Sequence, residues 1–162
     1  MGSSGDLSQR FTRCFAYFLE LALPLGLVWV AGQADGVAVW IAPEQRGTWE
    51  LHPWDQPQIL ALADDGGARY QAFWDWVAAH EPTEPLWQLD SIAVEPALQG
   101  GGIGRALIDA GLAMARADRT GAFLSTGTEE NVAIYRHCGF RVYDEADAPE
   151  EGPHIWFMRW DP

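Results

Sequence analysis

The chain has 162 residues, of which 48% are hydrophobic and nine are Trp, so it can bury the core of one domain and lacks the composition of a disordered protein. Its formal net charge is −13 and its ten cationic residues, all Arg, are scattered, which argues against nucleic acid as a partner because phosphate binding requires clustered Lys and Arg. An acidic surface would attract cationic amines, or would serve only solubility.

The first half of the chain is expected to form helices around a strand hairpin. In chain order we expect a flexible end at 1–6, a helix at 6–23, strands at 27–31 and 37–42, a loop-like stretch at 44–56, a short helix at 58–63 and a helix at 68–80. Asp35-Gly36 is a hairpin-type turn between the two strands. The apolar run at 14–31 is interrupted by Glu20 and Pro24, so it is too broken to span a bilayer and we expect no membrane association.

The second half alternates more regularly between strands and helices. After a breaker at 81–85 we expect a strand at 86–94, a glycine turn at 99–104, a helix at 105–117, a strand at 122–126, a helix at 128–138, and strands at 140–143 and 154–160. Thr128 can cap the last helix, and Gly139 suits its left-handed C-terminus. This order predicts a single α/β domain over 1–162 with a mixed sheet.

The two cysteines predict neither a disulfide framework nor a metal site. Cys14 and Cys138 are too few for a disulfide-rich scaffold, and no Cys/His cluster has the spacing of metal ligands. We therefore expect reduced thiols, no bound metal and a cytoplasmic location.

The glycine turn requires a physical reason, because it has four glycines in the five positions 100–104. Glycine costs backbone entropy, so such a cluster is expected where side chains must be absent. There the backbone N–H groups can converge on an anion, and the dipole of the following helix adds partial positive charge. Arg105, just past the turn, can reach the same anion. A plain strand-to-helix turn rarely needs so many glycines.

Three phosphate-binding motifs compete for this turn. The dinucleotide fingerprint of oxidoreductases requires Gly at 105, where Arg105 stands, and the P-loop requires Gly-Lys-Ser/Thr, which is absent from the sequence. The third pattern, Gln/Arg-x-x-Gly-x-Gly/Ala, matches the stretch Gln99-Gly100-Gly101-Gly102-Ile103-Gly104 at every fixed position. With this motif the sequence resembles the GNAT superfamily of N-acetyltransferases.

The resemblance extends over about residues 86–160. The family's strand before the turn is similar to Leu89-Asp90-Ser91-Ile92-Ala93-Val94-Glu95-Pro96. The family's Asn-x-x-x-Tyr and Gly-Phe signals correspond to Asn131 with Tyr135 and to Gly139-Phe140. The resemblance implies a mainly antiparallel central sheet flanked by helices, and acetyl-CoA as the co-substrate, bound by residues 86–160.

The resemblance also implies a role for each residue. Main-chain groups of Ile92, Ala93 and Val94 would pair with the pantetheine arm like an added strand, and the Val94 N–H would polarise the thioester carbonyl. The pyrophosphate would lie on the turn, whose residues are Gln99, Gly100, Gly101, Gly102, Ile103, Gly104 and Arg105. Asn131 would line the pantetheine channel, and Tyr135 would lie near the sulfur.

Acetyl transfer to an amine requires two proton transfers. Tyr135 is the candidate acid for the departing thiolate, or else a packed aromatic residue. Asp90 aligns with an acidic strand position that many relatives use as a base, directly or through water, or else it is a hydrogen-bonded strand carboxylate. His80, Glu81 and His137 are weaker candidates.

Two departures from the family keep the function open. About 23 residues precede the hairpin, enough for one helix, so the family's first strand has no counterpart and we expect a shortened N-terminus. A missing edge strand would leave apolar surface and unpaired backbone, which suggests a homodimer. Ser125 stands near a position where we expect a Glu in a related group. The sequence thus predicts an N-acetyltransferase for a primary amine of a small molecule, or a catalytically silent module that binds coenzyme A or a protein partner.

Overall fold

The computed structural model describes residues 4–26, 28–49, 57–60 and 65–162, and in these ranges six strands form one sheet in the order β1-β2-β3-β4-β6-β5. The strands are β1 (Val28–Ala31), β2 (Gly36–Ile41), β3 (Trp87–Val94), β4 (Ala122–Thr126), β5 (Arg141–Asp147) and β6 (His154–Trp160). Neighbouring strands run antiparallel except β3 and β4, which run parallel. The predicted mixed, mainly antiparallel sheet is therefore confirmed.

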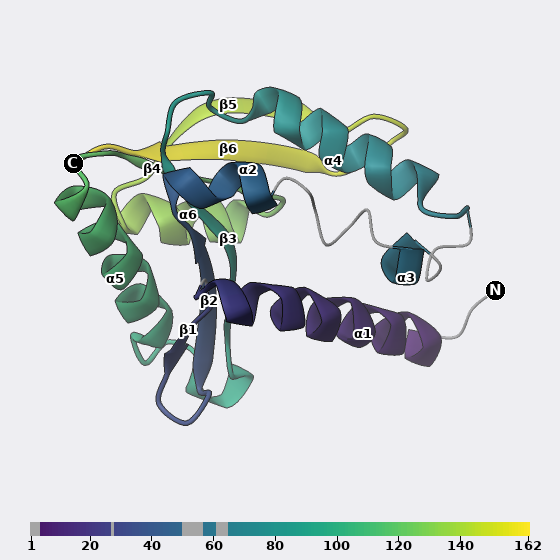
Figure 1. Ribbon diagram of the computed structural model, residues 1–162, viewed down its shortest axis with the longest axis horizontal. Helices are drawn as coiled ribbons and strands as arrows, with labels where there is room; N and C mark the ends of the chain where they lie inside the picture. The colour runs from purple at the N-terminus through teal and green to yellow at the C-terminus, as the bar shows by residue number, and fades with distance from the viewer. Residues whose placement is uncertain (1–3, 27, 50–56, 61–64) are drawn as a thin grey trace.

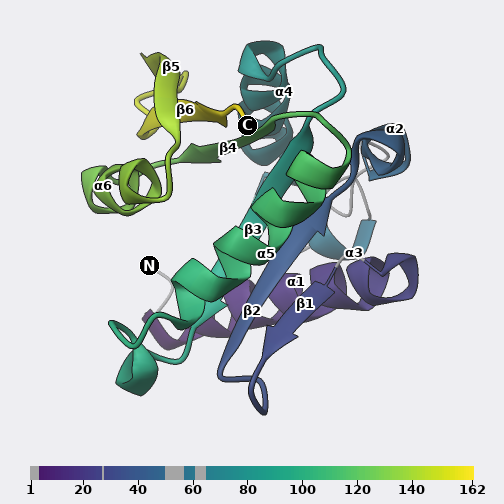
Figure 2. The same ribbon diagram turned by 90° about the vertical axis from the view of Figure 1, so that its left-hand side faces the viewer.

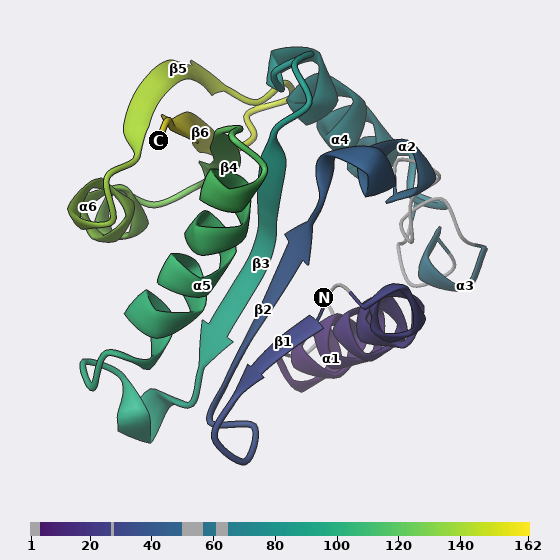
Figure 3. The same cartoon turned by 60° about the vertical axis from the view of Figure 1, so that its left-hand side comes forward.

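Helices cover both faces of this sheet (Figures 1 and 3). One face carries α1 (Ser4–Ala22) and α4 (Ala68–His80), and the other carries α5 (Ile103–Ala117) and α6 (Glu129–His137). The short connecting helices are η1 (Leu23–Leu25), η2 (Pro43–Gln45), α2 (Arg46–Trp49), α3 (Pro57–Leu60) and η4 (Pro96–Leu98). In the described ranges, none of the helices has both the length and the apolar character of a membrane span.

Each strand supplies side chains to both layers, because successive residues of a strand point to opposite faces. In β2, Trp40 packs in the core beneath α5, whereas Val39 packs against Phe18 of α1. Trp40 approaches α5 so closely that a Cβ on Gly111 would overlap its ring. The Trp40 Nε1 also donates a hydrogen bond of 3.2 Å to the Leu107 carbonyl. Gly111 is therefore needed in mid-helix despite its entropic cost.

The parallel strands β3 and β4 separate soon after they meet. Among the described residues, they are paired only at Trp87 with Ala122 and at Gln88 with Phe123. Beyond Gln88, β3 keeps β2 on one side and, within the described ranges, has no strand on the other. Figure 2 shows the two groups of strands diverging, with α5 along β2 and β3 and with α6 on the side of β4, β5 and β6. The sheet therefore has a gap between two of its central strands.

A β-bulge lies beside this gap. Val39 of β2 pairs with Ser91 and the next residue, Trp40, pairs with Leu89, so Asp90 is the extra residue of β3. A bulge re-aims side chains and bends the strand that carries it. This bulge could not be predicted from the sequence, because it arises from the pairing of two distant segments.

Most of the predicted elements are present. The helix at 68–80 and the strand at 122–126 have the predicted bounds. The strand predicted at 140–143 continues to Asp147, because β6 offers pairing partners as far as His154. The glycine turn is shorter than predicted, since α5 begins at Ile103 and contains Gly104. Helix α1 begins at Ser4, inside the stretch expected to be a flexible end, and in the described ranges no strand precedes β1.

The prediction of a loop at 44–56 is wrong for residues 44–49, which belong to the short helices η2 and α2. Tertiary and capping contacts hold these turns. The Gln45 side chain accepts a hydrogen bond from the Ala42 N–H and donates one to the Leu25 carbonyl. Residues 50–56, and residues 61–63 of the predicted short helix, lie outside the described residues.

Candidate functional site

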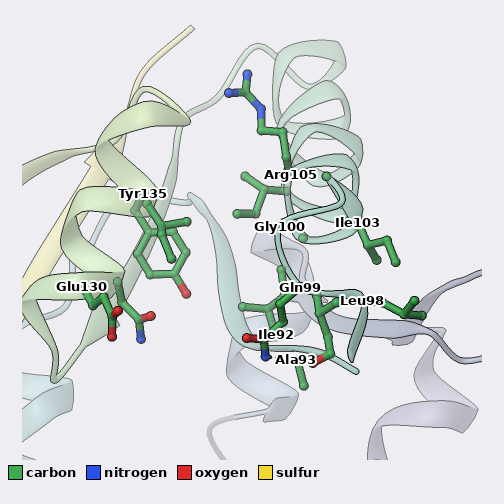
Figure 4. A pocket seen from close by; sticks show the side chains of 15 residues that line it. Ile92, Ala93, Leu98, Gln99, Gly100, Ile103, Arg105, Glu130 and Tyr135 are labelled. Atoms are coloured by element: carbon green, nitrogen blue, oxygen red, sulfur yellow. Dashed lines mark hydrogen bonds between the residues drawn. The ribbon is translucent and has the colours of Figure 1, made fainter. Parts of the chain in front are cut away.

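A cleft of about 760 Å³ opens where β3 and β4 diverge, on the face of the sheet covered by α5 and α6 (Figure 4). Of the twelve residues predicted to bind the cofactor, all but Gly101 line it. Four further lining residues were not predicted from the sequence: Leu98, Ile108, Glu130 and Ile134. They come from segments whose positions relative to the turn no local motif specifies.

One wall of the cleft is the free edge of β3. The Glu95 N–H donates to the Asp35 carbonyl, so this pair is hydrogen-bonded across the β2–β3 ladder. Hydrogen-bonded and non-hydrogen-bonded pairs alternate in an antiparallel ladder. The main-chain groups of Val94 and Ile92 therefore point away from β2, toward the cleft. In agreement, the Val94 carbonyl accepts a hydrogen bond of 3.2 Å from Gln99 Nε2.

The glycine turn forms the mouth of the cleft. Gly100 and Gly102 have φ angles of +80° and +87°, a region that side-chain-bearing residues rarely adopt. A Cβ on either glycine would meet nothing within 4 Å, so the backbone conformation, rather than packing, requires glycine at both positions. The Gly101 N–H donates to the Leu98 carbonyl within the turn, and Gly101 does not line the cleft.

Helix α5 begins at the turn, and its first N–H groups have no partners within the helix. These groups and the helix dipole attract an anion. The Arg105 side chain does not turn toward Gly100 but points away from it (Figure 4). Its Nε donates to both Asp109 carboxylate oxygens at 2.8 Å, and its Nη1 donates to the His137 carbonyl at 2.9 Å.

The opposite wall of the cleft is α6. Thr128 caps this helix as predicted, because its Oγ1 accepts a hydrogen bond of 3.2 Å from the Asn131 N–H. The Asn131 side chain donates to Thr126 Oγ1, also at 3.2 Å. The Asn131 amide is thus fixed at the cleft by contacts to the end of β4.

Tyr135 is the candidate acid, and its side chain enters the cleft with the hydroxyl group leading (Figure 4). The residue is 8% exposed, and its ring packs edge-on to Phe140 with the centroids 6.0 Å apart. Burial raises the pKa of Tyr135 to about 12, with a smaller contribution from Cys138. Tyr135 is therefore protonated at neutral pH, the state that a general acid requires.

Asp90 does not line the cleft. It is half-buried at the bulge of β3, and its Oδ2 accepts a hydrogen bond of 2.8 Å from Ser91 Oγ. Ser91 pairs with Val39, whose side chain faces α1, so Ser91 points to the face opposite α5. Ser125 of β4 lies on the same opposite face, because it pairs with Phe157, which packs against α4. Ser125 is exposed although β4 is an inner strand.

The weaker candidates lie outside the cleft lining. His80, at the end of α4, stacks on Phe157 with the centroids 4.9 Å apart, and its Nδ1 hydrogen-bonds the Trp76 carbonyl at 2.8 Å. Glu81 forms an ion pair with Arg46 at 3.2 Å. The His137 ring is exposed and hydrogen-bonds the Ala133 carbonyl of its own helix.

Both cysteines are free thiols. Within the described part of the chain, no group of three or more His, Cys, Asp and Glu side chains is placed to hold a metal ion.

Comparison with known proteins identifies the family. Residues 55–142 match the model of the acetyltransferase (GNAT) domain. The chain is 32% identical over 158 residues to mycothiol acetyltransferase of Kineococcus radiotolerans, covering 81% of this chain and 49% of that protein. It is 28% identical over 141 residues to mycothiol acetyltransferase of Clavibacter michiganensis, covering 75% and 45%. The chain thus spans about half the length of these curated relatives.

A solved structure supports the fold. A crystal structure described as histone acetyltransferase HPA2 and related acetyltransferase, from Corynebacterium glutamicum, is similar with a TM-score of 0.62 and 19% identity. The similarity covers 94% of this chain and 76% of that chain.

Proposed function

The chain belongs to the GNAT family of acetyltransferase domains, and from this premise we propose that it transfers the acetyl group of acetyl-CoA to a primary amine of a small molecule. The observation that carries the proposal is that one cleft combines the glycine turn at the start of α5 with the free edge of β3. The turn suits the pyrophosphate, and the edge suits the amide-containing pantetheine arm.

This arrangement determines the path of the cofactor through the cleft. With the pyrophosphate on the turn, the pantetheine arm runs along β3 toward the closed end of the cleft, passing Val94 before Ile92. Either N–H group points toward the cleft and can polarise the thioester carbonyl. The Val94 N–H is the group expected from the sequence, and the Ile92 N–H lies deeper and nearer the bulge.

The acceptor amine approaches from the face of the sheet that carries α1 and α4. Two observations support this direction: Asp90 lies at the bulge beside the gap, and Ser125 is exposed on an inner strand. The net charge of −13 would attract an ammonium group to the protein. The gap between β3 and β4 then brings the amine and the thioester together.

The reaction uses one proton donor and one proton acceptor. Asp90, directly or through a water molecule, takes a proton from the ammonium group, and the free amine attacks the thioester carbonyl carbon. The carbon–nitrogen bond forms, the carbon–sulfur bond breaks, and the departing thiolate takes the Tyr135 proton. The second proton that the attacking nitrogen loses restores the Tyr135 hydroxyl through water, and Asp90 releases its proton to solvent. The products are an amide and coenzyme A with a free thiol.

A binding experiment tests the cofactor. Acetyl-CoA at about 100 times its dissociation constant should stabilise the folded protein by roughly 2.7 kcal/mol, and NAD or ATP should add much less. An unchanged melting temperature up to millimolar acetyl-CoA would exclude acetyl-CoA as the ligand.

An activity experiment tests the reaction. Thiol release from acetyl-CoA should be followed over a panel of primary amines that includes amines related to mycothiol, the compound for which the curated relatives are named. Release that depends on one amine class is the expected result. Binding of acetyl-CoA without release for any amine would favour the silent module.

A further inference from the structure

The two walls of the cleft belong to two parts of the sheet that are joined mainly at one end. α5 packs on the strands up to β3, and α6 packs on the side of β4, β5 and β6 (Figures 2 and 3). Among the described residues, ladder pairing between the two parts is limited to Trp87 with Ala122 and Gln88 with Phe123. The sheet alone therefore does not fix the distance between the helices at the mouth of the cleft.

Helix α6 has nine residues and ends close to the reaction site, because Tyr135 is two residues from its last residue, His137. A helix this short is marginal by itself, and its last carbonyl groups lack partners within the helix. The Tyr135 carbonyl accepts from the N–H groups of Cys138 and Phe140, and the Arg136 carbonyl accepts from the Gly139 N–H. The carbonyl of His137, the last residue of α6, also needs a donor from outside the helix.

Arg105 supplies its donor from across the cleft. The Nη1 group of Arg105, in the first turn of α5, donates to the His137 carbonyl at 2.9 Å. A cation at this position also interacts favourably with the negative end of the α6 dipole. Asp109, one turn further along α5, holds the same guanidinium through Nε at 2.8 Å. The contact therefore links the start of one wall to the end of the other.

We propose that Arg105 is a positioning residue whose side chain caps α6 across the mouth of the cleft and thereby holds Tyr135 at the thioester. This role rests on the proposed acetyl transfer, and it differs from the role expected for the side chain from the sequence, which was to reach the anion on the turn. The backbone N–H of Arg105 still belongs to that turn. Asp109 orients the guanidinium toward α6.

A double-mutant cycle between Arg105→Gln and Tyr135→Phe tests the proposal. If Arg105 acts through Tyr135, Arg105→Gln lowers kcat roughly threefold to tenfold in the wild-type background, the coupling expected of interacting residues, and has little effect in the Tyr135→Phe background. The KM for acetyl-CoA changes less than kcat in both cases. Equal loss of kcat in the two backgrounds would overturn the proposal.

Two further variants separate positioning from charge. Arg105→Lys keeps a cation near the turn but cannot hold Asp109 and the His137 carbonyl in the same fork, so it should also lower kcat. If the side chain instead binds the pyrophosphate, Arg105→Gln raises the KM for acetyl-CoA and Arg105→Lys restores it, which would overturn the proposal.

Asp109→Asn weakens the contact that orients the guanidinium, so it should also lower kcat, by a smaller factor than Arg105→Gln. Arg136→Gln, an equal charge loss at an exposed site of α6, is the matched control and should leave kcat unchanged.

Hydrogen exchange of the protein without ligand gives a readout that does not depend on activity. Arg105→Gln should speed exchange of the Cys138, Gly139 and Phe140 amides, whose acceptors lie in the last turn of α6. Exchange at the start of β4 should stay as in the wild type. Unchanged exchange at the end of α6 would overturn the positioning role even if the proposed acetyl transfer holds. If exchange is faster but the wild-type protein has no activity, Arg105 still caps α6, and the proposed acetyl transfer is excluded.

Discussion

The two faces of the sheet differ in what they present at the gap between β3 and β4. The α5–α6 face presents mainly backbone: the turn at Gly100 and Gly102, the start of α5 and the free edge of β3, with Tyr135 as the proposed acid. The α1–α4 face presents side chains such as Asp90 and Ser125. A site built from backbone suits a ligand of fixed structure, whereas a site built from side chains can change its ligand by substitution. This difference predicts that the first face binds a common cofactor and the second selects the acceptor.

Removing the Tyr135 hydroxyl should have the largest effect, because in the proposed reaction this hydroxyl protonates the departing thiolate. Tyr135→Phe keeps the edge-on contact with Phe140, so the melting temperature should change little. Turnover should fall by about 10²-fold, the low end of the contribution of a general acid, since a thiolate is already a fair leaving group. The KM for acetyl-CoA should change little. The measurement is steady-state kinetics at saturating acetyl-CoA.

The pH profile sharpens this prediction. Because burial raises the pKa of Tyr135 to about 12, the hydroxyl keeps its proton at every pH up to about 10, and the wild type should show no alkaline limb due to Tyr135 in that range. The loss in Tyr135→Phe should therefore be nearly constant over this range. A wild-type turnover equal to that of the variant would make Tyr135 a packing residue.

The turn should give the next largest effect, on binding rather than on chemistry. Gly102 has a φ of +87°, and valine is strained there and also places a side chain where the pyrophosphate would lie. Losing one charge-assisted hydrogen bond costs roughly 1.5–3 kcal/mol, so the affinity of Gly102→Val for acetyl-CoA should fall about tenfold to a hundredfold. Calorimetric titration measures this, with circular dichroism to check the fold. Gly47→Ala, where a Cβ would meet nothing, is the control.

The same difference between the faces explains what the sequence could predict. Gly100, Gly102, Thr128 and Gly139 each satisfy a local backbone requirement, namely a left-handed φ or a helix cap, so their positions indicated the turn and the limits of α6 in advance. Twelve cofactor-binding residues were predicted from such signals and from the family resemblance, and eleven of them line one cleft.

Features that depend on distant segments could not be predicted. The bulge at Asp90 arises only when β2 and β3 pair, and the Arg105 contact with the His137 carbonyl joins residues 32 positions apart. The η2 and α2 turns depend on partners such as the Pro82 carbonyl, to which the Arg46 side chain donates. Periodicity reports which residues are apolar, but it does not report which segments meet.

On the acceptor face, Asp90→Asn should have a moderate effect that depends on pH. If Asp90 takes the ammonium proton, kcat/KM for the amine should fall roughly tenfold near pH 7, which is below the usual contribution of a general base because water can replace the carboxylate. As pH rises toward the pKa of an alkyl amine, about 10, solvent removes that proton and the loss should shrink. A loss that is constant with pH would indicate that Asp90 acts by shaping the bulge. Affinity for acetyl-CoA should stay unchanged, which separates this face from the cofactor face.

The smallest effect on activity is expected at Glu81, the other acidic candidate near the end of α4. Its carboxylate lies in an ion pair with Arg46, which also donates to the carbonyls of Pro82 and Glu84 and packs over the Phe123 ring. These contacts hold the connection between α4 and β3. Glu81→Gln keeps a hydrogen-bond acceptor for Arg46 but loses the charge of a largely buried pair, whose side chains are 16% and 12% exposed, so it should cost roughly 1.5–3 kcal/mol of stability.

Because this role is structural, kcat per folded molecule of Glu81→Gln should stay within about twofold of the wild type, a change too small for a lost general base. Urea unfolding measures the first effect and active-site-normalised turnover the second. A fall of tenfold or more near pH 7 that recovers at high pH, with the fold intact, would transfer the role of the base from Asp90 to Glu81. It would also place the acceptor amine at the end of α4 rather than beside the bulge of β3.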